Sequence, residues 1–235
     1  MVNKKVDGII VEGTKSAIPN PNKEIYEQFK KTIPCVFING CYPDLDIPLC
    51  AMNDVEGGYT ATKYLIDHGH KKIGACFKSD DMPGHKRYEG FMNAMHRQAI
   101  PVNEKNIHWY TTEDLEYMFK GDADSILLRR FEGCTAIICY NDQMALNMIR
   151  FMERNNIKPF EDISIIGFDN STLSKFLDLT SVNHAKYNLG ELAAESLIKQ
   201  IKTGERSDIK LKAEIVERSS VRTLKDNNDI PLYKI

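Results

Sequence analysis

This sequence of 235 residues lacks the features that would indicate a membrane protein, a nucleic-acid-binding protein or a disulfide-bonded protein. It has no signal peptide at its N-terminus and no apolar run long enough to span a bilayer. Its 31 basic and 33 acidic residues nearly cancel, which leaves no broad basic surface for binding phosphates. Its six cysteines form no CxxC pair and no zinc-ligand spacing, so we expect reduced structural thiols. These absences predict a cytoplasmic protein without a membrane partner.

The motifs of common catalytic sites are also missing. No GxGxxG follows the first apolar run, and there is no Walker loop, HExxH or GxSxG. The stretch from Asp67 to His70 resembles a metal site, but two histidines on either side of a helix-ending glycine favour a structural role. We therefore expect a binding protein without a cofactor or metal, and not an enzyme.

Short apolar runs alternate with amphipathic stretches along the chain. The predicted strands are residues 6–11, 36–39, 72–77, 107–110, 136–140 and 163–167. The predicted helices are residues 22–31, 54–66, 86–99, 113–130 with an interruption near Gly121, 142–155 and 189–201. Strands rich in Val and Ile that alternate with helices predict an α/β fold with parallel sheets covered on both faces.

Polar residues follow several of these predicted strands. In open parallel sheets, ligands bind beyond the carboxyl ends of the strands. The polar groups at those ends are Glu12 to Ser16, Asn53-Asp54, Lys78 to Asp81, Tyr110, Asn141-Asp142, Asp169-Asn170 and His184. The helix that starts near Gly84 adds Arg87 in its first turn. Carboxylates accept hydrogen bonds from hydroxyl groups, an arginine donates them and amides do both, so these groups suit a small polyol. Each charged hydrogen bond contributes about 1.5–3 kcal/mol.

Each of these groups also has a purely structural interpretation. Asn and Asp lead the ranking of helix caps, so Asn53, Asp54, Asn141 and Asp142 are candidate caps. Arg87 alone is more typical of a surface ion pair. In the Asn141-Asp142 pair, one residue can cap the helix while the other faces a ligand.

Six segments in register resemble the effector-binding domain of LacI/GalR-family repressors. They are "VDGIIV" (6–11), "NDVEGGYTATKYLIDHGHKKIG" (53–74), "KRYEGF" (86–91), "AIICYNDQMAL" (136–146), "DISIIGFDNS" (162–171) and "LTSVNHAKYNLGELAAESLI" (179–198). Three more, "GTKSAIPNPN" (13–22), "HKKIGACFKSDD" (70–81) and "VNHAKYNLG" (182–190), are similar to a branch that joins this domain to a GntR-type winged helix. The resemblance extends to about residue 224.

The resemblance implies a two-lobed, periplasmic-binding-protein-like fold of type I. Each lobe would be a parallel sheet flanked by helices, with a sugar between the lobes. The N-terminal lobe would comprise residues 1–69 and 186–212, the C-terminal lobe residues 70–185 and 213–224, and residues 225–235 would be a loosely ordered tail. The first two strand–helix units of the family have no counterpart here, so we expect the first lobe to be incomplete at its N-terminus.

The family's ligand residues fall on a small set of positions in this sequence. The ligand arginine corresponds to Arg87, the Asn after the strand to Asn141 and the strand-end carboxylate to Asp169. The further matches are His184 at the lobe crossover, Tyr110 as the cleft aromatic with Trp109 as a one-residue alternative, and Asp54 at the start of a cleft-facing helix. Glu12 and Lys15 are candidates by position only. We expect Asn141 to face the sugar, while Asp142 caps the helix or supports Asn141.

The resemblance implies the sugar-sensing half of a bacterial repressor. The effector would be L-arabinose or a similar pentose, the protein a homodimer, and operator DNA would be bound only through an N-terminal domain that this sequence lacks. Two alternatives remain open. One is an extracytoplasmic sugar-binding protein of a transport system, which six cysteines and no signal peptide disfavour. The other is a sugar-modifying enzyme with Asp54 or Asp169 as general base.

Overall fold

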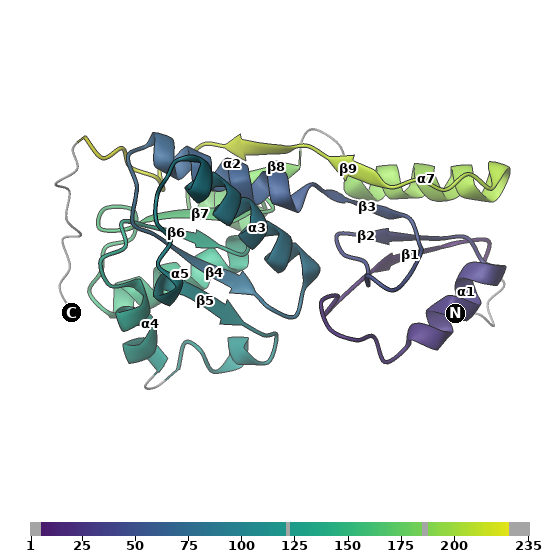
Figure 1. Cartoon of the computed structure of the whole chain (residues 1–235), viewed down its shortest axis with the longest axis horizontal. Coiled ribbons are helices and arrows are strands. Elements are labelled where there is room, and N and C mark those ends of the chain that lie inside the picture. Colours follow the sequence, from purple (N-terminus) through teal and green to yellow (C-terminus); the bar gives the residue numbers. More distant parts are fainter. Residues whose placement is uncertain (1–5, 121–122, 185–187, 226–235) are drawn as a thin grey trace. The chain divides into compact units, whose positions relative to one another are not determined.

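A computed structural model describes residues 6–120, 123–184 and 188–225, without the side chains of Ala123 and His184. The chain divides into two compact units. The first comprises Met1–Asn53, Asp80–Pro83 and His184–Lys212, and the second Asp54–Ser79, Gly84–Asn183 and Ala213–Ile235. Each unit contains a sheet flanked by helices (Figure 1), which confirms the predicted α/β class. No helix in the described part of the chain is long and apolar enough to cross a membrane.

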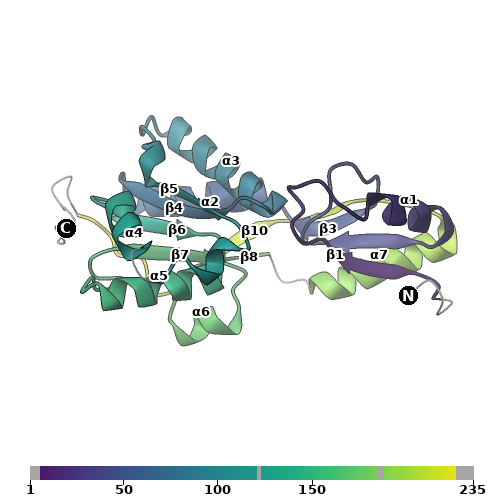
Figure 2. The same ribbon diagram turned by 90° about the horizontal axis from the view of Figure 1, so that it is seen from below.

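The sheet of the first unit has four short strands. Their order is β1 (Ile9–Glu12), β2 (Cys35–Ile38), β3 (Leu49–Met52) and β9 (Ile209–Leu211), all paired in parallel. The helices α1 (Lys23–Thr32) and α7 (Leu189–Thr203) lie on opposite faces of this sheet (Figure 2). Val36 packs with Ala193 on the α7 face, and Phe37 packs with Tyr26 on the α1 face. Alternate residues of β2 therefore fill two separate cores.

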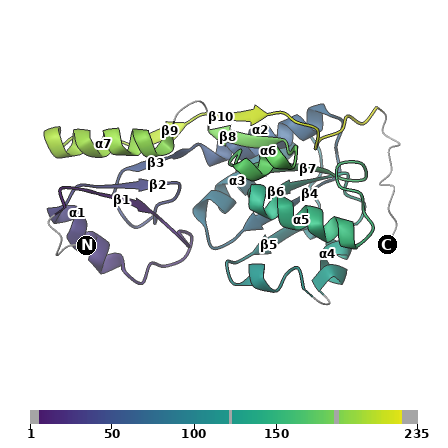
Figure 3. The same ribbon diagram turned by 180° about the vertical axis from the view of Figure 1, so that it is seen from behind.

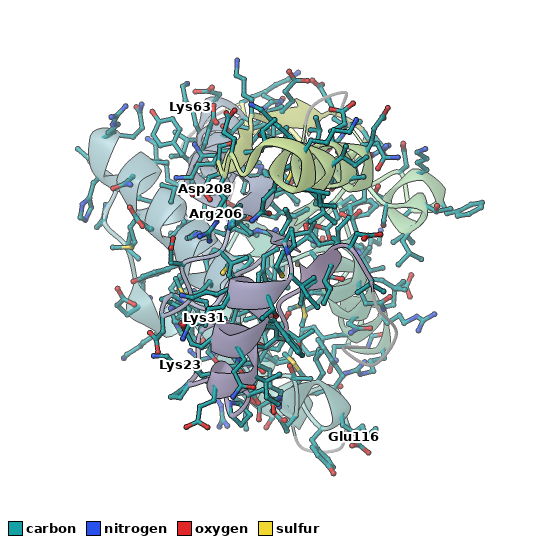
Figure 4. The ribbon with its side chains drawn as sticks, turned by 90° about the vertical axis from the view of Figure 1, so that its right-hand side faces the viewer. Lys23, Lys31, Lys63, Glu116, Arg206 and Asp208 are labelled. Atoms are coloured by element: carbon teal, nitrogen blue, oxygen red, sulfur yellow. The ribbon has the colours of Figure 1, made fainter. Side chains whose placement is uncertain are left out.

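Strand β9 reaches this sheet from far along the chain, and polar contacts fix its approach. Asp208 Oδ1 accepts a hydrogen bond from Leu49 N at 3.0 Å. Arg206 Nη1 lies 3.5 Å from Asp46 Oδ2. Both Arg206 and Asp208 are labelled in Figure 4. These contacts align β9 beside β3, a pairing that hydrophobic periodicity alone does not predict.

The larger sheet has six strands. Their order is β10 (Ala213–Val216), β8 (Ser181–His184), β7 (Ser164–Phe168), β6 (Ala136–Cys139), β4 (Ile73–Lys78) and β5 (Ile107–Tyr110). On one face lie α2 (Asp54–Asp67) and α3 (Met82–Arg97), and on the other α4 (Ala123–Phe131), α5 (Asp142–Arg154) and α6 (Thr172–Phe176) (Figure 2). Figure 3 shows the face that carries α5 and α6. Met144, Met148 and Met152 of α5 are buried in the core, as their helical spacing predicts.

One predicted helix differs from the structure. The helix predicted over 113–130 is wrong in its first half, where a 3-10 turn (Asp114–Glu116) precedes the shorter α4, and Gly121 lies outside the described residues. Asp114 Oδ2 accepts hydrogen bonds from Thr111 N at 2.7 Å and Thr111 Oγ1 at 2.9 Å, and this local turn competes with helix. The loose tail expected over residues 225–235 stays a prediction, because residues 226–235 also lie outside the described part of the chain.

Helix α2 belongs to the second unit, whereas the resemblance placed it in the first lobe. The physical reason is its close approach to α3. A Cβ atom added to Gly58 would lie 2.1 Å from Arg87 O, and one added to Gly90 would lie 2.1 Å from Val55 O. Only glycine permits this spacing between the two helix backbones. The short strands β3, β8, β9 and β10 and helix α6 were not predicted.

Candidate functional site

Arg87 is the centre of a cluster in the second unit. It lies in the second turn of α3, and its side chain is only 8% exposed. Arg87 Nε donates to Asp54 Oδ1 at 2.8 Å, and Asp54, the first residue of α2, is itself buried. The close packing of α2 on α3 therefore brings the sequence-predicted Arg87 and Asp54 together as a buried ion pair.

Two strand ends supply the remaining contacts of this guanidinium. Arg87 Nη1 donates to the backbone oxygen of Tyr140, directly after β6. The carbon Cζ lies 4.9 Å from the ring centroid of Tyr140 and 4.4 Å from that of Phe168, the last residue of β7. Burial disfavours the charge on Arg87, but the carboxylates of Asp54 and Asp169 outweigh it and raise the pKa above its ordinary value. Arg87 is therefore a fixed cation between two aromatic faces.

Asp169 follows β7 and presents a carboxylate beside Arg87. Its Oδ1 atom lies 3.8 Å from Arg87 Nη2, and its side chain is 48% exposed. Its φ of 93° and that of Asn170, 46°, lie in the left-handed region, which non-glycine residues rarely adopt. Strained backbone of this kind persists only where the surroundings impose it, and it is concentrated at functional sites.

Asn141 occupies the corresponding position after β6, but its role differs in part from the expectation. Asn141, not Asp142, is the N-cap of α5, because Asn141 Oδ1 accepts a hydrogen bond from Met144 N at 2.9 Å. The Nδ2 amide of Asn141 is left as the group of this side chain that can donate to a ligand. Asp142 is buried and supports neither the cap nor Asn141. It binds Ser171 and Ser181 instead.

The aromatic residues of this cluster are not those that the sequence indicated. Tyr110 is only 2% exposed and belongs to the core, with its ring edge-on to Tyr140 at a centroid distance of 6.3 Å. Trp109, the one-residue alternative, stacks on His85 at 5.1 Å. Tyr140 and Phe168 contact Arg87 instead. Their position in the sequence could have indicated them, because Tyr140 immediately precedes Asn141 in "YND" and Phe168 immediately precedes Asp169 in "FDN".

Three other candidates belong to the first unit. Glu12 is exposed at the end of β1, and its Oε1 accepts a hydrogen bond from Asn39 Nδ2 at 2.6 Å. Lys15 follows in a loop with a φ of 50°. His184 ends β8, and its side chain is outside the described part of the structure. The structure thus groups Arg87 and Asp54 with Asp169 in one unit, while these three remain candidates by position.

The chemistry of this cluster fits hydrogen bonding to a polar ligand. It contains one buried cation, one exposed carboxylate, one amide donor and aromatic faces. Asp54 is engaged by Arg87, so the cluster does not offer it as a general base. A carboxylate next to a guanidinium matches a hydroxyl group, which both donates and accepts.

Comparison with known proteins identifies the family of this chain. Residues 62–221 match the family described as periplasmic binding protein-like domain. An arabinose metabolism transcriptional repressor of Halalkalibacterium halodurans is 39% identical over 211 residues, 88% of this chain and 56% of that protein. Its namesake in Geobacillus stearothermophilus is 34% identical over 231 residues, 95% of this chain and 64% of that protein.

A solved structure shares the fold. The crystal structure of a LacI family transcriptional regulator from Enterococcus faecium with bound ribose superposes with a TM-score of 0.78 at 25% identity, over 95% of this chain and 82% of that one. These relatives are transcriptional regulators and not enzymes. The chain spans less than two thirds of the length of each of the two repressors.

Proposed function

We infer that this chain, which belongs to the periplasmic binding protein-like domain family of LacI-type regulators, senses a small sugar for a transcriptional repressor. The observation that carries the proposal is the Arg87 cluster. A buried arginine is held by Asp54, while Asp169 lies beside it on a strained, half-exposed turn. The sugar would bind this face of the second unit, with Asn141 as a further donor.

The geometry supports the proposed sugar binding in physical terms. Hydroxyl groups of the sugar would donate to Asp169 and accept from Arg87 and Asn141 Nδ2. Hydrogen bonds to charged groups are worth about 1.5–3 kcal/mol each, so a few give micromolar affinity. The half-buried ring of Tyr140 offers an apolar surface to the C–H side of the sugar. Glu12, Lys15 and His184 remain further candidate ligands by position, whereas the burial of Tyr110 in the core argues against its contact with a ligand.

We choose L-arabinose as the effector because two relatives are named for arabinose metabolism. The test is calorimetric titration of this chain with L-arabinose, D-ribose, D-glucose and D-galactose. We expect micromolar binding of L-arabinose and weaker binding of the others. Binding of glucose or galactose without arabinose would overturn this choice, and no binding of any sugar would overturn the sensor function.

Matched variants locate the site within the chain. Asp169→Asn removes the exposed carboxylate and is expected to weaken sugar binding by about tenfold or more. The control is Asp67→Asn, because Asp67 is an exposed carboxylate at the opposite end of α2 from Asp54, paired with Lys63 at 2.6 Å. Equal loss of affinity in both variants would show that the effect is not specific to the Arg87 cluster.

The regulatory output would depend on two conformations of the protein. Sugar must bind one of them more tightly, since a ligand with equal affinity for both shifts nothing. A homodimer would pass the change to a winged helix in another part of the polypeptide, which would bind operator DNA in the cytoplasm. Phe176 of α6 is 84% exposed, and we propose it as an aromatic anchor of the dimer contact.

A further inference from the structure

The turn that carries Asp169 is held by hydrogen bonds to the buried carboxylate of Asp142. Asp142 is 1% exposed and comes from the first turn of α5. Its Oδ2 atom accepts hydrogen bonds from Ser171 N at 2.7 Å and Ser171 Oγ at 2.8 Å. Its Oδ1 atom accepts a hydrogen bond from Ser181 Oγ at 2.7 Å. One carboxylate thus joins α5, the turn after β7 and strand β8.

Every residue of this turn is fixed by a neighbour. Asp169 N donates to Val182 O at 2.9 Å, and Asn170 N donates to Ser181 Oγ at 3.0 Å. Asn170 Oδ1 accepts from Arg218 Nη2 at 2.7 Å. Ser181 Oγ accepts a hydrogen bond from Asn170 N and donates one to Asp142 Oδ1. The Asp142 carboxylate therefore holds Ser171 directly and Asn170 through Ser181. These bonds impose the left-handed conformations of Asp169 and Asn170.

The absence of a side chain at Gly167 provides the space that the Asp142 carboxylate occupies. A Cβ atom added to Gly167 would lie 2.4 Å from Asp142 Oδ1, so the strand β7 needs glycine at the point where Asp142 passes. Burial raises the pKa of Asp142, and the hydrogen bonds from Ser181 and Ser171 act in the opposite direction. Three donors converge on two oxygens, and a carboxylate satisfies all three as acceptor.

We propose that Asp142 is a positioning residue for effector recognition, which fixes the turn 169–171 and thereby aims the Asp169 carboxylate at the sugar beside Arg87. The proposal rests on the proposed sugar-sensing function. Asp142 does not contact the ligand in this scheme. It sets the direction of the group that does, and its influence on affinity passes through Asp169.

The first experiment needs no ligand. Amide hydrogen exchange of residues 169–171 is compared between the wild-type chain and Asp142→Asn. We expect faster exchange at Ser171, whose N–H is bound by Asp142 Oδ2. The matched control is Asp162→Asn at the opposite end of β7, because Asp162 is also buried and binds a backbone N–H, that of Lys158, at 2.7 Å. Unchanged exchange at the turn in Asp142→Asn would overturn the proposal.

The second experiment is a double-mutant cycle in L-arabinose affinity. We expect Asp142→Asn to weaken binding by about tenfold in the wild-type background and by less than about twofold in Asp169→Asn. Equal effects in both backgrounds would show a merely structural role and overturn the proposal. Absence of sugar binding by the wild-type chain would overturn the proposed function instead, while the exchange result would still decide whether Asp142 fixes the turn.

Discussion

Lowering the pH is predicted to destabilise the second unit, and the buried histidine His70 provides a separable part of this effect. His70 precedes β4 and is fully buried. Its Nε2 atom lies 3.0 Å from Arg222 O, and its Nδ1 atom lies 3.0 Å from Thr135 Oγ1. A carbonyl oxygen only accepts, so Nε2 carries the proton of a neutral ring. The histidine is therefore a structural link, which agrees with the interpretation preferred from its sequence context.

The magnitude follows from the shift of its pKa. Burial lowers the pKa of His70 from 6.5 to about 4. As the pH falls, His70 is therefore protonated in the unfolded chain before it is protonated in the folded chain. The contribution of neutral His70 to the free energy of unfolding is present above pH 6.5 and is lost as the pH falls from 6.5 to 4. The free energy of unfolding should fall by about 2 kcal/mol between pH 7 and pH 5 and by about 3 kcal/mol by pH 4 from this group.

Urea unfolding followed by tryptophan fluorescence tests this prediction. Trp109 is the single tryptophan of the sequence and lies in β5, so its signal reports the second unit. His70→Gln keeps a donor for Arg222 O but cannot be protonated, and its stability should depend less on pH by the amount above. His96→Gln, which changes an exposed histidine of α3, should follow wild type. Parallel pH profiles for wild type and His70→Gln would refute the reasoning.

Three further predictions concern the packing and contacts around the site. Gly58→Ala should lower the free energy of unfolding by about 1–3 kcal/mol, because the new Cβ meets Arg87 O at 2.1 Å; unchanged urea stability would contradict this. Asn141→Asp keeps the Oδ1 cap but loses Nδ2, so it should weaken sugar binding in calorimetry while keeping stability, whereas Asn141→Ala should also lose about 1 kcal/mol of stability. Phe176→Ser should raise the dimer dissociation constant in sedimentation, and an unaltered constant would move the interface elsewhere.

The fold class predicts a list of polar groups among which the candidate site residues occur. Alternating strands and helices place the carboxyl ends of parallel strands at one edge, and Asp169 and Asn141 lie at two such ends. Arg87 joins them because α3 follows the next strand in the same sheet. The choice of these three residues as ligand residues from the longer list rested on the family resemblance, because strand-end position alone does not separate a ligand residue from a helix cap or a surface ion pair.

The division of roles within Asn141-Asp142 was not predictable from the sequence. Both residue types cap helices well, so local propensity does not choose between them. The choice depends on Ser171 and Ser181, which lie 29 and 39 residues further along the chain. The same limit applies to Tyr110, whose burial depends on the contact with Tyr140 across the sheet. Tertiary partners decide what a local motif leaves open.

The unequal environments of Asp54 and Asp169 would allow one arginine to serve both the structure and the proposed recognition of a sugar. Asp54, the Tyr140 carbonyl and two aromatic rings fix Arg87 before any ligand arrives, so little side-chain entropy remains to be lost on binding. The separation of 3.8 Å between Arg87 Nη2 and Asp169 Oδ1 exceeds a direct hydrogen bond. A hydroxyl group can accept from the guanidinium and donate to the carboxylate, whereas a group that only donates or only accepts can bind one of the two and not the other. Under the proposed function, the pair would therefore favour hydroxyl groups over groups that only donate or only accept.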